Sequence, residues 1–181
     1  MNLGRFRIIT VCGMPGSGKS YAARELAERL FVQGRQVRLV DLDEEVELRS
    51  GKSVARIFAE DGEAAFRALE KTLLRSLLVP PITQSVIQVQ QDAPIFANKV
   101  VALGGGTLQD PENLELVREN SYCIWLDTPL ETIADRLWAQ GNIGSRPLLA
   151  GAKTKKELSE LLQNIYDARK AGYRAAAKEI R

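Results

Sequence analysis

The sequence predicts an α/β protein in which helices cover both faces of a central parallel sheet. Short runs of β-branched and apolar residues alternate with helical patterns along the 181 residues, and this alternation favours parallel strands joined by crossover helices. A content of 45% hydrophobic and 27% charged residues is ordinary for a soluble globular protein. The length suits a single core, so we expect residues 1–181 to form one domain.

The apolar pattern locates the individual elements. Strand-like runs, apolar and often β-branched, are Phe6–Val11, Val37–Val40, Val100–Leu103 and Tyr122–Leu126. Apolar residues at helical spacing mark Ser20–Phe31, Val54–Ala59, Glu63–Leu78, Pro111–Glu119, Leu130–Trp138 and Thr154–Lys178. The stretch 79–98 is long for a connection in a compact domain, and its Ser85–Gln90 part could form a short extra strand.

Residues 13–20 match G-x-x-x-x-G-K-[ST], the phosphate-binding loop. A predicted strand precedes them and an amphipathic helix follows, which is the setting that the motif requires. The glycines let backbone N–H groups turn toward a polyphosphate, Lys19 adds a cation, and the Ser20 hydroxyl can ligate Mg²⁺. The alternative is a Gly-rich turn without a ligand. The predicted nucleotide-binding residues here are Gly13, Met14, Pro15, Gly16, Ser17, Gly18, Lys19 and Ser20.

Two carboxylates, Asp41 and Asp43, follow the second predicted strand. On an extended segment, residues i and i+2 point the same way, and the carboxyl ends of parallel strands face the ligand crevice. One carboxylate could hold Mg²⁺ through water, while the other could accept a proton or hydrogen bond from a substrate hydroxyl. The alternative is the acidic N-terminus of a helix, since Glu44, Glu45 and Glu47 follow.

Three later features could complete a site. Arg67 and Glu70 stand three apart on a predicted helix and can touch, which leaves a guanidinium fork free for a carboxylate, although the spacing alone equally fits a surface pair. The triplet Gly104–Gly106 ends a buried strand, where either a ligand or a tight turn approaches the backbone. Arg146 lies in the Gly-rich stretch 141–152, which is typical of a mobile lid that carries a cation toward phosphates.

Composition excludes several classes of function. A net charge of +2 gives no field for nucleic acid or an anionic membrane. The chain has no histidine, so imidazole is neither a base nor a metal ligand. No apolar run approaches the ~20 residues of a membrane span, and the N-terminus lacks the apolar core of a signal peptide. Cys12 and Cys123 are expected to be buried free thiols. These features predict a cytoplasmic protein.

The ordered set of motifs resembles the shikimate kinase family. The resemblance implies a three-layer P-loop NTPase fold of the nucleoside-monophosphate-kinase type, with about five parallel strands and a lid. It implies a single kinase domain, with a substrate-binding part at about 41–78, an insertion at 79–98 and a lid at about 141–152. The motifs that carry it are GMPGSGKS at 13–20, Asp41-x-Asp43, GEAAFRALE at 62–70, GGG at 104–106, RPLL at 146–149 and Arg169-x-x-x-Tyr173.

The resemblance also implies the reaction and the acceptor site. The reaction would be phosphorylation of the 3-hydroxyl of shikimate, dependent on ATP and Mg²⁺. Asp43 would hold the reacting hydroxyl, while Arg67 and Arg169 would clamp the carboxylate of shikimate, with Glu70 orienting Arg67. The backbone of Gly104, Gly105 and Gly106 would lie along the substrate.

At the nucleotide end, the resemblance implies that Ser20 ligates Mg²⁺ directly and that Asp41 binds it through water. Arg136 would stack on adenine, and Arg146 would reach the phosphates when the lid closes. The residues expected to carry catalysis are Lys19, Asp43 and Arg146.

The chain departs from the family pattern in places. The segment 79–98 is longer than the family usually carries, and the stretch 31–37 is closer in length to adenylylsulfate kinases. The chain ends at Arg181, where the family continues through a last strand and a C-terminal helix that help to hold adenine. The alternatives are a kinase of a gluconate-like hydroxy acid or of adenylylsulfate, or a non-catalytic nucleotide-binding relative. The expected partners are ATP or ADP and shikimate, bound by a monomer.

Overall fold

The computed structural model describes residues 7–79, 98–141, 143 and 146–181. A five-stranded sheet forms its centre, with strand order β2-β3-β1-β4-β5 and parallel pairing throughout. This confirms the predicted parallel α/β architecture. The strands are β1 (Ile8–Gly13), β2 (Val37–Asp41), β3 (Asn98–Ala102), β4 (Tyr122–Leu126) and β5 (Glu179–Ile180).

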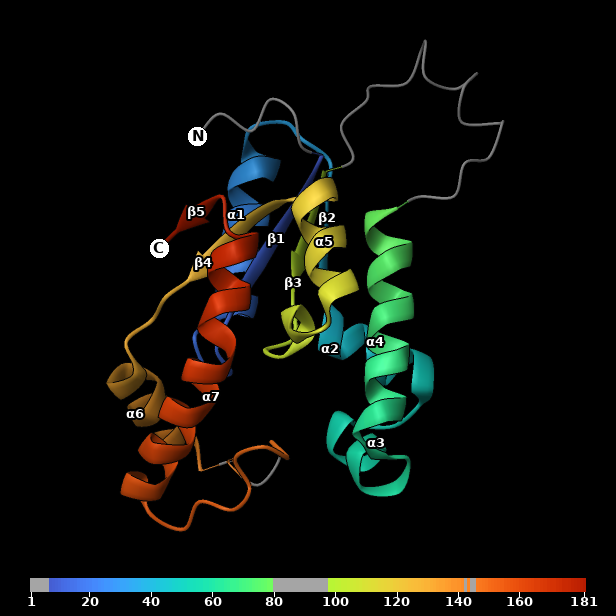
Figure 1. Ribbon diagram of the computed structural model, residues 1–181. Helices are drawn as coiled ribbons and strands as arrows, with labels where there is room; N and C mark the ends of the chain where they lie inside the picture. The colour runs from blue at the N-terminus through green and yellow to red at the C-terminus, as the bar shows by residue number, and fades with distance from the viewer. Residues whose placement is uncertain (1–6, 80–97, 142, 144–145) are drawn as a thin grey trace.

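Helices make the outer layers, with α5 and α7 on the near side of the sheet and α1 behind it (Figure 1). Alternate residues of the central strands face opposite layers. Ile9 and Val11 pack with Ala23 and Leu30 of α1, whereas Cys12 belongs to the core under the helices of the other face. The helices are α1 (Lys19–Val32), α2 (Leu42–Ser50), α3 (Val54–Glu60), α4 (Gly62–Leu78), α5 (Pro111–Asn120), α6 (Leu130–Gln140) and α7 (Lys155–Ala176), with a short 3₁₀ helix η2 (Thr107–Gln109).

Two elements differ from the sequence prediction. Helix α2 was not predicted, because Leu42 and Val46 are its buried residues and Leu48 is 77% exposed, so no apolar stripe marks it. Strand β5 corrects the expectation that the last strand of the family lies beyond Arg181, because Glu179–Ile180 already form it. It is two residues long, and the chain enters it where the N–H of Lys178 donates to the carbonyl oxygen of Cys123 at 2.8 Å.

The crossovers bring three loops to one edge of the sheet. The phosphate-binding loop follows β1, Asp41 ends β2, and Gly104 follows β3. The chain leaves β1 toward β2, on the β3 side of the sheet, and leaves the neighbouring β4 toward β5, on the other side. This topological switch point at the carboxyl ends of the strands is where α/β proteins bind ligands.

Other sequence expectations are placed as follows. Cys12 and Cys123 are free and buried, with their Sγ atoms 3.6 Å apart, as predicted. The possible strand at Ser85–Gln90 lies outside the described residues, as does most of the proposed insertion at 79–98. None of the helices in the described part of the chain has the length and apolar character needed to cross a membrane.

Candidate active site

The phosphate-binding loop at residues 13–20 joins β1 to α1, as the motif requires. Gly16 and Gly18 have φ angles of 80° and 94°, a left-handed conformation that is unfavourable for residues with a Cβ. Helix α1 begins at Lys19 after Gly18, which has no side chain to cap the N–H groups of the first turn. Those N–H groups, at the positive end of α1, are therefore available to an anion.

Lys19 lies across this loop. Its Nζ donates to the carbonyl oxygen of Met14 at 3.0 Å. Burial lowers the pKa of Lys19, while the carboxylates of Asp43 and Asp41 oppose that shift. The ammonium group thus stands between the loop backbone and two anions, where a phosphate oxygen can replace the carbonyl as its partner.

A cavity of about 240 Å³ lies beside the loop and is lined by Gly16, Gly18, Ser20 and Arg136 among others. Arg136 Nη1 is 3.5 Å from the carbonyl oxygen of Ser17, so this arginine rests against the loop. Two predicted loop residues offer only backbone to a nucleotide, because their side chains are buried: these are Met14 and Ser17.

Ser20 and Asp41 provide a pair of oxygen donors at this cavity. Ser20 Oγ donates to Asp41 Oδ2 at 2.5 Å, and a hydroxyl beside a carboxylate is the hard oxygen donor set that Mg²⁺ accepts. Within the described residues, no group of three or more Asp, Glu or Cys side chains is placed to hold a metal ion. The pair fits Mg²⁺ when phosphate oxygens complete the shell, as in most nucleotide-dependent enzymes.

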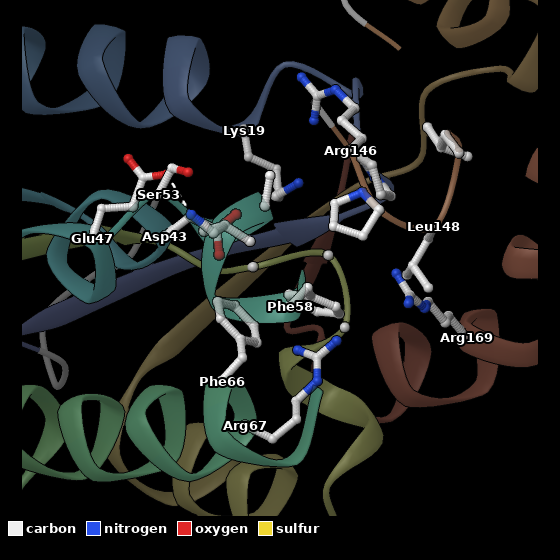
Figure 2. Close-up of a pocket in the computed structure, with 18 residues that line it drawn as sticks. Lys19, Asp43, Glu47, Ser53, Phe58, Phe66, Arg67, Arg146, Leu148 and Arg169 are labelled. Carbon is white, nitrogen blue, oxygen red and sulfur yellow. Dashed lines mark hydrogen bonds between the residues drawn. The ribbon is translucent and has the colours of Figure 1, made fainter. Parts of the chain in front are cut away.

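A second cavity, of about 390 Å³, adjoins the first, since Lys19, Asp43 and Arg146 line both. Figure 2 shows Arg67 reaching into it from α4 and Arg169 from α7. A cavity of this size with a few converging polar groups has the character of a small-molecule site. Its apolar wall includes Phe58, Phe66 and Leu148.

Asp43 lies in the first turn of α2, where the two cavities meet. The prediction that Asp41 and Asp43 share one extended segment is wrong, because β2 ends at Asp41 and α2 begins at Leu42. Asp41 is the N-cap of α2 and accepts from the N–H of Asp43 at 3.1 Å, so the acidic helix N-terminus is also real. Burial raises the pKa of Asp43 to about 6, against the opposing charge of Lys19.

Arg67 and Glu70 form a half-buried pair rather than a surface pair, with the Arg67 side chain 28% exposed. Arg67 Nη1 lies 2.7 Å from Glu70 Oε2, and the Glu70 side chain is 0% exposed. Glu63 accepts from the outer edge of the same guanidinium, with Nη2–Oε1 at 3.1 Å. Held on two sides, the guanidinium keeps one orientation along the cavity wall.

Arg169 is only 8% exposed and lies one helical turn before Tyr173, which is 0% exposed. The Tyr173 hydroxyl donates to the carbonyl oxygen of Gly105 at 2.5 Å. Burial raises the pKa of Tyr173 to about 12, although its hydrogen bond with Arg169 acts in the opposite direction. Helix α7 is thereby attached to the glycine triplet, and Arg169 is placed opposite Arg67.

At the first position of the triplet, Gly104, two side chains lie too close to the backbone for any residue with a Cβ. A Cβ at Gly104 would lie 2.6 Å from Glu70 Oε1 and 2.8 Å from Asp43 Oδ1. These distances are far below van der Waals contact, and both neighbours are carboxylates within the buried site. The backbone here must therefore lack a side chain for the two acids to stand where they do.

Comparison with known proteins decides the family. The model of the shikimate kinase family matches residues 15–180. The chain belongs to the shikimate kinase family. The shikimate kinase of Persephonella marina is 40% identical over 157 residues, which cover 87% of this chain and 80% of that protein. The shikimate kinase of Chlorobium chlorochromatii is 36% identical over 173 residues, which cover 93% of this chain and 78% of that one.

Solved structures agree with this family. Shikimate kinase from Acinetobacter baumannii, determined in complex with shikimate, matches with a TM-score of 0.78 and 26% identity, over 99% of this chain and 84% of that chain. The shikimate kinase from Bacteroides thetaiotaomicron matches with a TM-score of 0.74 and 27% identity, over 96% of this chain and 84% of that chain. The resemblance inferred from the motifs, and the P-loop kinase fold that it implied, are confirmed.

The lid that the family resemblance implied at 141–152 is described except at 142, 144 and 145. Its backbone forms successive turns, in which the N–H of Arg146 donates to the carbonyl oxygen of Ile143 at 3.0 Å. Arg146 Nε is buried and has no hydrogen-bond partner among the described residues, which leaves a donor for a ligand at the meeting point of the cavities. Motion of this segment stays a prediction.

Sequence reasoning missed part of the larger cavity, of about 390 Å³, and of the residues behind it. Phe58 and Phe66 form an aromatic wall, with ring centroids 5.0 Å apart, but their spacing fits ordinary core residues of short helices. Thr107 was also missed: its hydroxyl donates to Glu70 Oε1 at 2.5 Å. The available signal was its position directly after the glycine triplet, which places it next to the predicted site.

Proposed function

We propose that this protein transfers the γ-phosphoryl group of ATP to the 3-hydroxyl of shikimate, which gives shikimate 3-phosphate and ADP. The observation that carries the proposal is the acceptor cavity, where Arg67 and Arg169 face each other near Asp43 and Lys19. Shikimate has one carboxylate and several hydroxyls on a carbon ring, so two arginines and one general base match its functional groups. The relatives named shikimate kinases support this choice of acceptor.

At the nucleotide end, the backbone N–H groups of residues 13–20 bind the phosphates, and Lys19 exchanges the Met14 carbonyl for phosphate oxygens. Arg136 lines the same cavity and stacks on adenine. Together these groups fix the γ-phosphate at the boundary of the acceptor cavity. Phosphoryl transfer depends mainly on such positioning and on charge stabilisation.

Ser20 and Asp41 are the residues that would hold Mg²⁺, Ser20 directly and Asp41 through water. Their hydroxyl and carboxylate oxygens are already within hydrogen-bond distance. The chemistry that bound Mg²⁺ supplies is neutralisation of phosphate charge.

At the acceptor end, Arg67 and Arg169 bind the carboxylate and orient the ring along Gly104–Gly106. Asp43 accepts the proton of the 3-hydroxyl of shikimate. At the same time the oxygen of this hydroxyl forms a bond to the γ-phosphorus, and the bond from phosphorus to the β,γ-bridging oxygen breaks. A pKa of about 6 keeps this carboxylate ionised at neutral pH, yet makes it a stronger base than an exposed aspartate.

Arg146 completes the charge complement around the transferring group. Its buried Nε has no hydrogen-bond partner among the described residues, and the side chain lines both cavities. Closure of the lid brings it to the phosphoryl oxygens and excludes water that would otherwise hydrolyse ATP.

The direct test measures ADP release with ATP and Mg²⁺ against shikimate, quinate, gluconate and adenylylsulfate as acceptors. We expect shikimate to give the highest kcat/KM, with the Lys19→Ala variant as the background control. A higher value with gluconate or adenylylsulfate reassigns the acceptor. ADP release that stays at the Lys19→Ala background with every acceptor identifies a non-catalytic nucleotide-binding protein.

We further propose that the protein acts as a monomer in the cytoplasm. The proposal is supported by the position of the phosphate-binding loop and of Arg67 and Arg169, which lie on one chain without a group from a second copy. Light scattering after size-exclusion chromatography measures the mass: about one chain supports the proposal, and a stable dimer contradicts it.

A further inference from the structure

Behind the Arg67 guanidinium lies a small buried polar cluster that the proposed reaction does not use directly. Glu70 and Thr107 are both 0% exposed, and Asn113 is 2% exposed. Asn113 Nδ2 donates to the carbonyl oxygen of Thr107 at 3.1 Å, which fixes the backbone of η2. Buried polar groups are held in place by such mutual hydrogen bonds, because each unpaired group is unfavourable.

The two oxygens of Glu70 have separate partners in this cluster. Oε2 accepts from Arg67 Nη1 at 2.7 Å, and Oε1 accepts from Thr107 Oγ1 at 2.5 Å. With both oxygens engaged, the plane of the carboxylate is fixed. The direction of the bond to Arg67 is therefore set by the position of the Thr107 hydroxyl.

The glycine triplet links the same residues from the other side. A Cβ at Gly106 would lie 2.5 Å from Arg67 Nη2, and one at Gly104 would lie 3.0 Å from Thr107 Oγ1. Thr107 thus begins η2 directly after a segment that touches the guanidinium. A shift of Thr107 moves the backbone wall and the Glu70 carboxylate together.

We propose that Thr107 is a positioning residue for acceptor binding: its hydroxyl fixes the Glu70 carboxylate, and this carboxylate holds Arg67 toward the acceptor cavity. The inference rests on the proposed role of Arg67 in binding the acceptor carboxylate. Without the hydroxyl, Glu70 Oε1 is left buried and unpaired, and the carboxylate turns away from its present plane. Arg67 then loses the orientation that a bidentate contact with a carboxylate requires.

The test is the Thr107→Val variant, which keeps the shape of the side chain and removes the hydroxyl. We expect the KM for shikimate to rise roughly tenfold, while kcat and the KM for ATP change by less than about threefold. Thr107→Ser restores the hydroxyl and should return the KM for shikimate to within about twofold of the original. Thr107→Ala serves the same purpose if the valine variant does not fold.

Thr10→Val is the matched control. Thr10 is also fully buried and also hydrogen-bonded to a side-chain oxygen, that of Ser121 at 2.9 Å, but neither cavity includes it. It should lower the melting temperature without changing the KM for shikimate. Equal rises of that KM in Thr107→Val and Thr10→Val, or no rescue by serine, mean that Thr107 is merely structural.

A double-mutant cycle tests the route through Glu70. In the Glu70→Gln background, Thr107→Val should raise the KM for shikimate by less than about twofold, because the carboxylate that it positions is absent. A further tenfold rise in that background overturns the proposal.

A ligand-free measurement separates this inference from the proposed function. The ¹⁵N order parameter of the Arg67 Nε–H bond should fall in Thr107→Val and stay unchanged in Thr10→Val and Thr107→Ser. If shikimate is not a substrate, the proposed function fails while this measurement still reports on the link from Thr107 to Arg67. An unchanged order parameter overturns the link whatever the acceptor is.

Discussion

The phosphate-binding loop is one continuous segment that offers mainly backbone N–H groups, whereas the charged groups proposed to bind the acceptor come from three helices. Asp43 comes from α2, Arg67 from α4 and Arg169 from α7. The loop depends on glycine conformation and on the end of α1, both of which are local properties. The acceptor cavity depends on buried charges that hold one another in place, such as Glu70 and Arg67.

This difference predicts two kinds of response to substitution. Changes at the nucleotide end should alter ATP binding or turnover with little effect on folding, because loss of the Lys19 ammonium removes a desolvated charge and one hydrogen bond to a backbone carbonyl. Changes at the acceptor end should alter recognition and stability together, because a buried charge that loses its partner destabilises the fold.

Lys19→Ala should have the largest effect, a fall in kcat/KM for ATP of roughly 10⁴-fold. The ammonium contributes to phosphate binding and to stabilisation of the transition state, so both terms are lost. Steady-state kinetics measure it, with the melting temperature as the control for folding. A loss below tenfold is incompatible with the proposed role of Lys19.

Arg146→Ala should lower kcat by roughly 10³-fold, which is within the range seen for arginines that stabilise transferring phosphoryl groups. ATP binding to the open form should be nearly intact. Lysine at this position should restore only part of the rate, because it lacks the planar fork. Amide exchange across 141–152 should slow when ADP and shikimate are added together; protection already complete in the free protein argues against a closing lid.

Asp43→Asn should lower kcat by roughly 10²–10³-fold with a small change in the KM for shikimate, because the amide is not a base. In the unmodified protein, kcat/KM should fall as the pH drops through about 6, the pKa of Asp43. A profile that stays flat from about pH 7 to 5 excludes Asp43 as the base.

The same variant should be more stable than the unmodified protein at neutral pH. The folded-state pKa of Asp43 is raised from 3.8 to about 6, so ionisation opposes folding, and the stability present below pH 3.8 is lost as pH rises through about 6. Asparagine should therefore increase the free energy of unfolding by about 3 kcal/mol at pH 7 and by little near pH 4. Chemical denaturation at the two pH values measures this difference.

Arg67→Ala and Arg169→Ala should each raise the KM for shikimate by roughly 30- to 5000-fold, since loss of one partner of a desolvated charge pair costs about 2–5 kcal/mol. The KM for ATP should hardly change. Arg67→Ala should also lower the melting temperature, because Glu70 remains buried without its cation. Equal damage to both KM values would point to general destabilisation instead.

The sequence predicted most of the nucleotide end and less of the acceptor end, for the same physical reason. The loop motif, its flanking strand and its helix are read from neighbouring residues. The burial of Glu70 and its bond to Thr107 arise from segments 37 residues apart, and spacing on one helix cannot distinguish a buried pair from an exposed one. Asp43 lines both cavities, as the sequence led us to expect. It lies on a helix and not on an extended segment, because α2 has no apolar stripe to reveal it.

Calorimetric titration of ADP and shikimate into two variants measures whether the two ends of the site recognise different ligands by different means. Lys19→Ala should weaken ADP binding by roughly tenfold or more and change shikimate binding by less than about threefold. Arg169→Ala should do the reverse. If either folded variant weakens both ligands to a similar degree, the two ends are not separate recognition sites and the account is contradicted.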